Sequence, residues 1–167
     1  MTAQWLCEAY AERVYRFAAL VSRGNSEAED IAQDALERAI RNIHRFDATR
    51  GTADGWLWSI VVRAAADAGR ADNRRTRIFL RLIEDRHADD DADVVIDDDV
   101  TDEALLDAVR RLKSRDRTML ALRFGADLPY REIGRLLGLS EAAVGISLRR
   151  ILKRLKRELD PREGGRP

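Results

Sequence analysis

Apolar residues recur at intervals of three and four along most of the chain, which is the spacing of one face of an α-helix. No segment shows the sustained alternation of β-branched residues that marks a strand. The pattern predicts a first helix over about 3–22, a second from about 27, and a third over about 53–75. Four further helices are expected after Thr101, Ser114, Pro129 and Ser140. The sequence therefore predicts an all-α protein.

The second and third predicted helices each carry one apolar stripe. Ser26 followed by Glu29 fits a capping box, which places the start of the second helix near Glu27. Its stripe is predicted to be buried and consists of Ala28, Ile31, Ala32, Ala35, Leu36, Ala39, Ile40 and Ile43. In the third helix the residues expected to face inward are Trp56, Leu57, Ile60, Val61 and Ala64.

Charge divides the 167-residue chain, although its 30 basic and 30 acidic residues cancel. Residues 84–103 carry 11 acidic residues and one basic residue, whereas residues 104–167 carry 16 basic and 8 acidic residues. Runs of one charge repel themselves, so the acidic stretch indicates a flexible linker between two small helical domains. A single cysteine, Cys7, excludes an internal disulfide and a Cys-pair zinc site. We expect no secretory signal and no membrane insertion, because the apolar runs are too short.

The clearest motif lies between Tyr130 and Arg150 and has the layout of a helix-turn-helix. Gly138 can supply a positive φ at the end of the first helix, and Ser140 can cap the second. In such a unit the start of the second helix enters the major groove of DNA. Basic residues at Lys153, Arg154, Lys156 and Arg157 extend that helix as a stripe suited to phosphates. An ordinary helical hairpin with a solvated basic face is the alternative.

Two blocks of sequence resemble the extracytoplasmic-function sigma factors, the small two-domain sigma subunits of bacterial RNA polymerase. The first block runs from Ala28 to Leu36 (AEDIAQDAL) and continues through His44–Asp47 (HRFD), Gly51, Trp56, Leu57 and Ile60. The second runs from Leu128 to Leu155. The resemblance implies sigma region 2 over 1–83, an acidic linker over 84–101, sigma region 4 over 102–160 and a disordered tail over 161–167.

The resemblance also implies partners and roles. It implies a chain that performs no catalysis and binds core RNA polymerase and promoter DNA. We also expect a cytoplasmic protein without a cofactor, with an anti-sigma factor as a further partner. Asp30 and Asp34 could suggest a metal site, but no third ligand or histidine stands at a matching spacing, so we expect no metal. The polar face of the second helix would bind the polymerase through Glu29, Asp30, Gln33, Asp34 and Glu37.

The third helix and the loop before it would melt and hold the minus-ten element. The residues expected to contact that element are Arg50, Thr52, Trp58, Arg63, Arg70, Arg74 and Arg75. Trp56 and Trp58 stand two positions apart and cannot share one helix face. We therefore expect Trp56 in the core, and Trp58 either at the DNA surface or half-buried in a structural role.

The helix-turn-helix would bind the minus-thirty-five element. Its expected contacts are Arg131, Glu141, Ala142, Gly145, Ser147, Arg149, Arg150, Lys153 and Arg154. The chain departs from the family pattern at Ala53 and Asp54 in the minus-ten loop and at Gly145 and Ser147 in the recognition helix. Two other interpretations remain: a helix-turn-helix regulator acting without polymerase, and a helical interaction protein that does not bind DNA.

Overall fold

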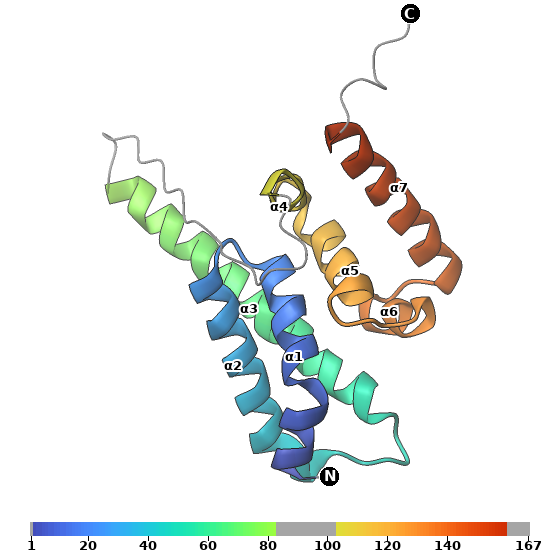
Figure 1. Cartoon of the computed structure of the whole chain (residues 1–167). Coiled ribbons are helices and arrows are strands. Elements are labelled where there is room, and N and C mark those ends of the chain that lie inside the picture. Colours follow the sequence, from blue (N-terminus) through green and yellow to red (C-terminus); the bar gives the residue numbers. More distant parts are fainter. Residues whose placement is uncertain (1, 83–102, 160–167) are drawn as a thin grey trace, which may run out of the picture.

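The computed structural model describes residues 2–82 and 103–159 (Figure 1). Within these ranges every regular element is a helix, which confirms the all-α prediction. Seven α-helices occur there, together with one short 3-10 helix, η1. The acidic linker, the predicted cap at Thr101 and the C-terminal tail lie outside the described residues. None of the described helices combines the length and the apolar character that crossing a membrane requires.

The N-terminal bundle consists of α1 (Ala3–Val21), α2 (Asn25–Asn42), η1 (Ile43–Arg45) and α3 (Ala53–Leu82). Helix α2 begins earlier than predicted, with Gly24 as its N-cap, and the backbone N–H of Arg23 donates to the Glu27 carboxylate at 2.7 Å. The capping box predicted for Ser26 and Glu29 is therefore wrong. Helix α3 runs to Leu82, so the apolar run that begins at Ile78 continues the helix rather than ending it near 75.

Small side chains let α1 and α2 approach each other closely. Ala28, Ala35 and Ala39 are fully buried along α2, at the positions that the apolar stripe predicted. Phe17 of α1 and Trp58 of α3 fill the remaining space, with their ring centroids 5.7 Å apart in an edge-on arrangement. This geometry is the one that aromatic pairs prefer.

The C-terminal bundle consists of α4 (Glu103–Arg110), α5 (Ser114–Phe124), α6 (Tyr130–Leu137) and α7 (Glu141–Leu159). Its core is built from buried aliphatic residues of every helix and of the α5–α6 connection. They are Ala108, Val109, Leu120, Leu122, Leu128, Ile133, Val144, Leu148, Ile151 and Leu155.

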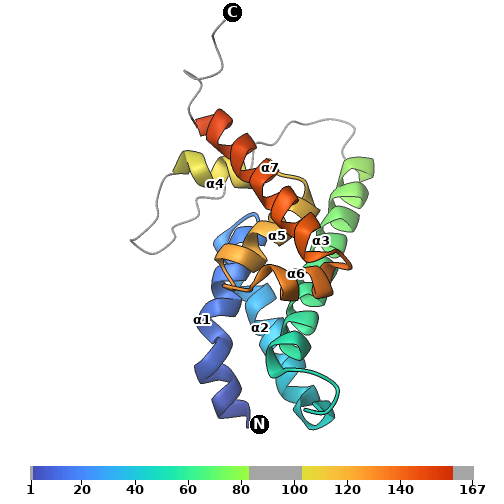
Figure 2. The ribbon, with the colours of Figure 1, turned by 90° about the vertical axis from the view of Figure 1, so that its right-hand side faces the viewer.

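The two bundles pack directly against each other, with α5 lying along α1 (Figures 1 and 2). Gly125 marks the closest approach, because a Cβ there would stand 2.9 Å from the backbone N and Cα of Phe17. Arg13 fastens the contact: its Nε and Nη2 donate to the carbonyl oxygen of Ala126 at 2.9 and 2.6 Å. The same guanidinium lies 3.6 Å from the Asp54 carboxylate and 5.5 Å from the ring centroid of Trp58.

Candidate nucleic-acid interface

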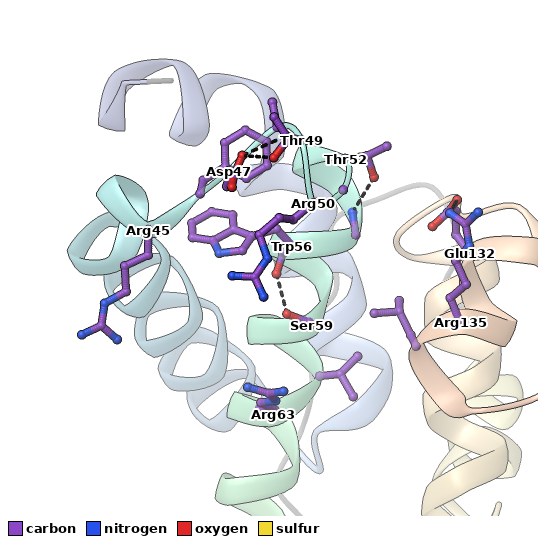
Figure 3. Close-up of a pocket in the computed structure, with 16 residues that line it drawn as sticks. Arg45, Asp47, Thr49, Arg50, Thr52, Trp56, Ser59, Arg63, Glu132 and Arg135 are labelled. Carbon is purple, nitrogen blue, oxygen red and sulfur yellow. Dashed lines mark hydrogen bonds and ion pairs between the residues drawn. The ribbon is translucent and has the colours of Figure 1, made fainter.

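A cavity of about 1010 Å³ opens beside the loop that joins η1 to α3 (Figure 3). Local hydrogen bonds shape this loop. Asp47 accepts from the backbone N–H and the hydroxyl of Thr49 at 2.9 and 2.7 Å, and these two bonds hold the pKa of Asp47 below its usual value. Thr52 then caps α3 by accepting from the N–H of Gly55 at 3.1 Å. These hydrogen bonds give the loop a defined conformation at the mouth of the cavity.

Trp56 forms an aromatic wall of this cavity. Its ring is only partly buried and lies against Phe46, with ring centroids 5.7 Å apart. The Ser59 hydroxyl donates to the Trp56 carbonyl oxygen at 2.7 Å, one turn further along α3. An indole held in this way offers a flat face on which an unstacked base can lie.

Cations surround that aromatic wall. Arg45 and Arg50 come from η1 and the loop, and Arg63 comes from α3; all three are exposed. Helix α6 reaches the same cavity from the other bundle with Glu132 and Arg135, whose side chains are 2.7 Å apart (Figure 3). Positive charge next to an aromatic face is the combination that single-stranded nucleic acid requires.

The two tryptophans of α3 exchange their expected places. Trp58 is 0% exposed and packs among Phe17 and Arg13, so its predicted contact with DNA is wrong. Its indole N–H is buried without a hydrogen-bond partner among the described residues. The apolar register carried the signal: Leu57, Val61 and Ala64 are buried, and Trp58 lies on the same stripe. Trp56, which we expected in the core, lies at its edge and faces the cavity.

The remaining predicted minus-ten residues divide along α3 and its loop. Arg50, Thr52 and Arg63 line the cavity beside Trp56. Arg70 is exposed but lies two turns beyond Arg63 and pairs with Asp67 at 2.5 Å. The side chains of Arg74 and Arg75 lie outside the described part of the chain. Sequence reasoning missed Arg45 and Phe46 as cavity residues, although both stand within the HRFD run.

The acidic face of α2 has an open half and a paired half. Glu29, Asp30 and Gln33 are exposed near the start of the helix. Further along, Asp34 pairs with Arg38 at 2.7 Å, and Arg38 also donates to Asp67 of α3 at 2.7 Å. These bonds, to Asp67 first and then to Asp34, raise the pKa of Arg38.

Glu37 belongs to the paired half of α2. It accepts from Gln33 at 3.1 Å and from Arg41 at 2.6 Å, and these bonds hold its pKa below its usual value. Each of the five predicted polymerase contacts therefore lies on an accessible or half-accessible surface of α2, but Asp34 and Glu37 already have cationic partners.

The helix-turn-helix has the turn that the sequence predicted. Gly138 adopts φ 67°, a left-handed conformation that glycine takes without strain. The N–H of Leu139 donates to the Gly134 carbonyl oxygen at 2.8 Å, and the Ser140 hydroxyl accepts from the N–H of Ala143 at 3.1 Å. A side chain at Gly134 would stand 2.5 Å from the Leu139 oxygen, so the turn is tightly closed.

Most predicted minus-thirty-five residues lie on the outer surface of α6 and α7. Seven of them are exposed: Arg131, Glu141, Ala142, Arg149, Arg150, Lys153 and Arg154. Ser147 is half-buried. Gly145 is buried under the ring of Tyr130, which would stand 3.3 Å from a Cβ at that position, so its prediction as an exposed DNA contact is wrong. Ile146, which sequence reasoning missed, is 50% exposed beside these residues.

Two family models match this chain. A model described as "Sigma-70 region 2" matches residues 6–75, and one described as "Sigma-70, region 4" matches residues 102–155. The first match contains the cavity loop and the acidic face of α2, and the second contains the helix-turn-helix.

Curated relatives carry matching names. The chain is 27% identical over 155 residues to the ECF RNA polymerase sigma factor BldN of Streptomyces coelicolor, covering 92% of this chain and 59% of that protein. It is 24% identical to the ECF RNA polymerase sigma factor SigW of Bacillus subtilis, covering 92% of this chain and 87% of that protein. The chain thus spans under two thirds of the length of the first of these relatives.

Solved structures share the fold. The sigma factor RpoE from Bartonella quintana, in complex with the anti-sigma factor NepR, has a TM-score of 0.72 at 17% identity, covering 93% of this chain and 95% of that one. CnrH, in complex with the cytosolic domain of CnrY, has a TM-score of 0.65 at 20% identity, covering 96% and 88%.

Proposed function

The chain belongs to the sigma-70 family as an extracytoplasmic-function sigma factor, and on this premise we propose that it directs core RNA polymerase to a set of promoters. In this proposal residues 1–83 act as region 2, which binds the polymerase and holds the minus-ten strand. Residues 102–160 act as region 4, which binds the minus-thirty-five duplex, and residues 84–101 link the two.

The cavity beside Trp56 is the observation that carries this proposal. A base taken out of the stack can lie on the Trp56 indole, and stacking of this kind contributes about 1–3 kcal/mol per base. Arg50 and Arg63 then neutralise the phosphates on either side of that base. The Thr52 hydroxyl accepts from Gly55 and still has its proton to donate to the strand.

Region 4 would bind the duplex through the exposed face of α7. Arg149, Arg150 and Lys153 share that face and supply three cations for phosphate oxygens or for the acceptor edge of guanine. Glu141 and Ala142 stand in the first turn, where a recognition helix is nearest to the base edges. Gly145 lies on the opposite, buried side of α7, where the absence of a side chain lets the Tyr130 ring pack against the helix.

The open half of α2 would bind the polymerase. Glu29 and Asp30 are exposed there and suit a basic partner surface. The Arg38 bridge to Asp34 and Asp67 fixes α2 against α3 and so orients this face relative to the minus-ten cavity. We further propose that the protein acts in the cytoplasm, performs no catalysis of its own, and is held inactive by an anti-sigma factor. RpoE of Bartonella quintana is found in complex with the anti-sigma factor NepR, which supports a partner of this kind.

Run-off transcription with purified bacterial core polymerase on a promoter library tests the proposal. The chain should start RNA chains at positions that core alone does not use, and Trp56→Ala should reduce them sharply. Tyr15→Ala removes an exposed aromatic residue of α1 outside the cavity and is the matched control, expected to initiate like the unaltered protein. No new start sites with the unaltered protein would refute the proposal.

The same preparation separates the proposal from its main rival. A helix-turn-helix regulator that acts without polymerase would bind specific duplex DNA tightly as the isolated chain. A sigma factor should instead bind promoter DNA weakly alone and strongly with core enzyme. Fluorescence anisotropy of one labelled promoter fragment, with and without core, distinguishes the two.

A further inference from the structure

A second cavity, of about 520 Å³, lies between the two bundles on a different part of their contact from the cavity beside Trp56. Its walls come from α1, α2 and α3 on one side and from α4, α5 and their connection on the other. The volume falls within the range of small-molecule sites, about 300–1,000 Å³. The charged side chains that line it are Arg23, Glu27, Arg70, Arg110 and Arg117.

Arg117 carries one of these charges and is partly withdrawn from solvent. Its guanidinium is half-buried and donates to the Arg110 carbonyl oxygen at 3.2 Å, and no carboxylate of the described residues forms an ion pair with it. Burial lowers the pKa of Arg117, as does the neighbouring charge of Arg23, while Glu27 acts in the opposite direction. A cation in this position is stabilised by an anion placed in the cavity.

Two more arginines can turn toward such an anion. Arg70 and Arg110 pair with Asp67 and Asp107 at 2.5 and 3.1 Å, along their own helices. Both carboxylates are about half exposed, and ion pairs this accessible contribute little, so a bound phosphate can replace them at small cost.

The N-terminus of α5 faces the same space. Ser114 and Arg117 of its first turn line the cavity, and Lys113 at the N-cap position makes no side-chain cap hydrogen bond. The backbone N–H groups of that turn and the helix dipole both favour a negative group. Helix α5 therefore adds neutral donors to the arginines.

The rest of the cavity is apolar and open. Ile31, Val62 and Leu112 form its walls, and Gly69 of α3 lines it with no side chain. A Cβ at Gly69 would meet nothing within 4 Å, so space remains there for a flat group. An anion site joined to an apolar slot matches a phosphate group attached to an aromatic base.

We propose that this cavity binds a nucleotide with two or more phosphates, the phosphates at Arg117 and the N-terminus of α5 and the base beside Gly69. This inference does not depend on promoter binding. Because both bundles supply walls, the ligand binds the packed arrangement of the bundles better than a separated one and stabilises it.

Isothermal titration calorimetry of the full chain tests the proposal with ADP, GDP, pyrophosphate and guanosine. At least one nucleoside diphosphate should bind in the micromolar range, and pyrophosphate and guanosine should each bind at least tenfold more weakly. Arg117→Gln removes the half-buried cation, and Gly69→Leu places a side chain in the space beside Gly69, where a Cβ would meet nothing within 4 Å; each should weaken binding tenfold or more. Circular dichroism melting shows whether each variant remains folded.

Arg115→Gln is the matched control, because Arg115 lies on the same helix turn, is exposed and does not line the cavity. It should bind the nucleotide like the unaltered chain. If Arg115→Gln weakened nucleotide binding as much as Arg117→Gln, the binding would reflect only the general surface charge, and the proposal would be overturned. Undiminished binding by folded Gly69→Leu, pyrophosphate binding as tightly as the nucleotides, or no nucleotide binding at millimolar concentration would also overturn it.

Discussion

The two proposed DNA-binding surfaces differ in how much of the molecule lies across them. The face of α7 that carries Arg149, Arg150 and Lys153 is exposed. The cavity beside Trp56 is instead shared with the other bundle, because Glu132 and Arg135 of α6 form part of its wall. The packed arrangement therefore leaves the duplex-binding face accessible and partly covers the strand-binding one.

Promoter geometry gives this difference a consequence. The two promoter elements lie about two duplex turns apart, or about 70 Å. In the packed arrangement α6 of the second bundle touches the minus-ten cavity itself, so both surfaces cannot reach their elements at once. We therefore expect the bundles to separate when the protein engages a promoter, and the contact between α1 and α5 to resist that step.

The largest expected effect comes from Trp56→Ala. Loss of one stacking platform of about 1–3 kcal/mol should reduce promoter opening by about 5- to 150-fold. Duplex binding by region 4 should not change, since α7 is untouched. Permanganate footprinting of the minus-ten element measures opening, and Trp56→Phe should retain most of it. If Trp56→Ala reduced promoter opening and duplex binding by the same factor, the cavity beside Trp56 and the face of α7 would not act as separate surfaces.

Gly125→Val should separate the bundles. Its side chain would meet the backbone of Phe17, and forcing extra atoms into a tight contact costs about 1–3 kcal/mol. We expect a lower melting temperature, a larger radius by small-angle scattering, and tighter binding of a minus-ten single strand. Gly51→Ala, where nothing lies within 4 Å of a Cβ, is the control for melting temperature and radius but not for strand binding, because Gly51 lines the cavity beside Trp56. An unchanged radius would argue against the α1–α5 contact as the restraint.

Arg149→Gln and Lys153→Gln should weaken duplex binding severalfold each. If each residue neutralises one phosphate, the slope of log affinity against log salt should fall by about 1 per variant. Arg16→Gln, an exposed arginine of α1, should leave the slope unchanged. Anisotropy titrations over a salt series provide the measurement, and an unchanged slope in the α7 variants would remove those residues from the interface.

The smallest expected effect concerns the bridge between α2 and α3. Arg38, and after it Arg70, holds the pKa of Asp67 below its usual value. A carboxyl group whose pKa is lowered by folding stabilises the protein above its unfolded pKa, about 4, and loses that contribution as the pH falls through the lower folded value. Asp67→Asn should therefore lower the melting temperature slightly at pH 7, and the difference should vanish near pH 2. A difference that persists in acid would contradict this.

Local features of the sequence predicted local features of the structure. The left-handed turn at Gly138 and the Ser140 cap form as expected, because their hydrogen bonds join residues at most five positions apart. Five residues of the stripe predicted for α2 are buried, whereas Leu36, Ile40 and Ile43 are half-buried at its edge. The start of α2 was missed because the Glu27 carboxylate bonds back to Arg23, a competing cap of the same kind as the one predicted.

The two wrong site predictions have a different origin. Which tryptophan of α3 faces the cavity depends on how α3 is rotated against α1, and Phe17 and Arg13 fix that rotation. Gly145 is buried only because Tyr130, from the other helix of the motif, covers it. Tyr130 is far from Gly145 in the chain, so no local pattern identified that burial. For Trp58 the one local signal was the apolar register of Leu57, Val61 and Ala64, which places it on the buried stripe.

The sequence by itself determined the helices and their turns, since these depend on side chains a few positions apart. It also determined the family, which depends on the residue order of two motifs. Only the tertiary structure decided that α5 lies on α1, that Trp56 rather than Trp58 is accessible, and that a cavity with four arginines opens between the bundles. The physical reason is that burial and close approach are set by the partner surface. The bond from Arg13 to Ala126 joins residues 113 positions apart.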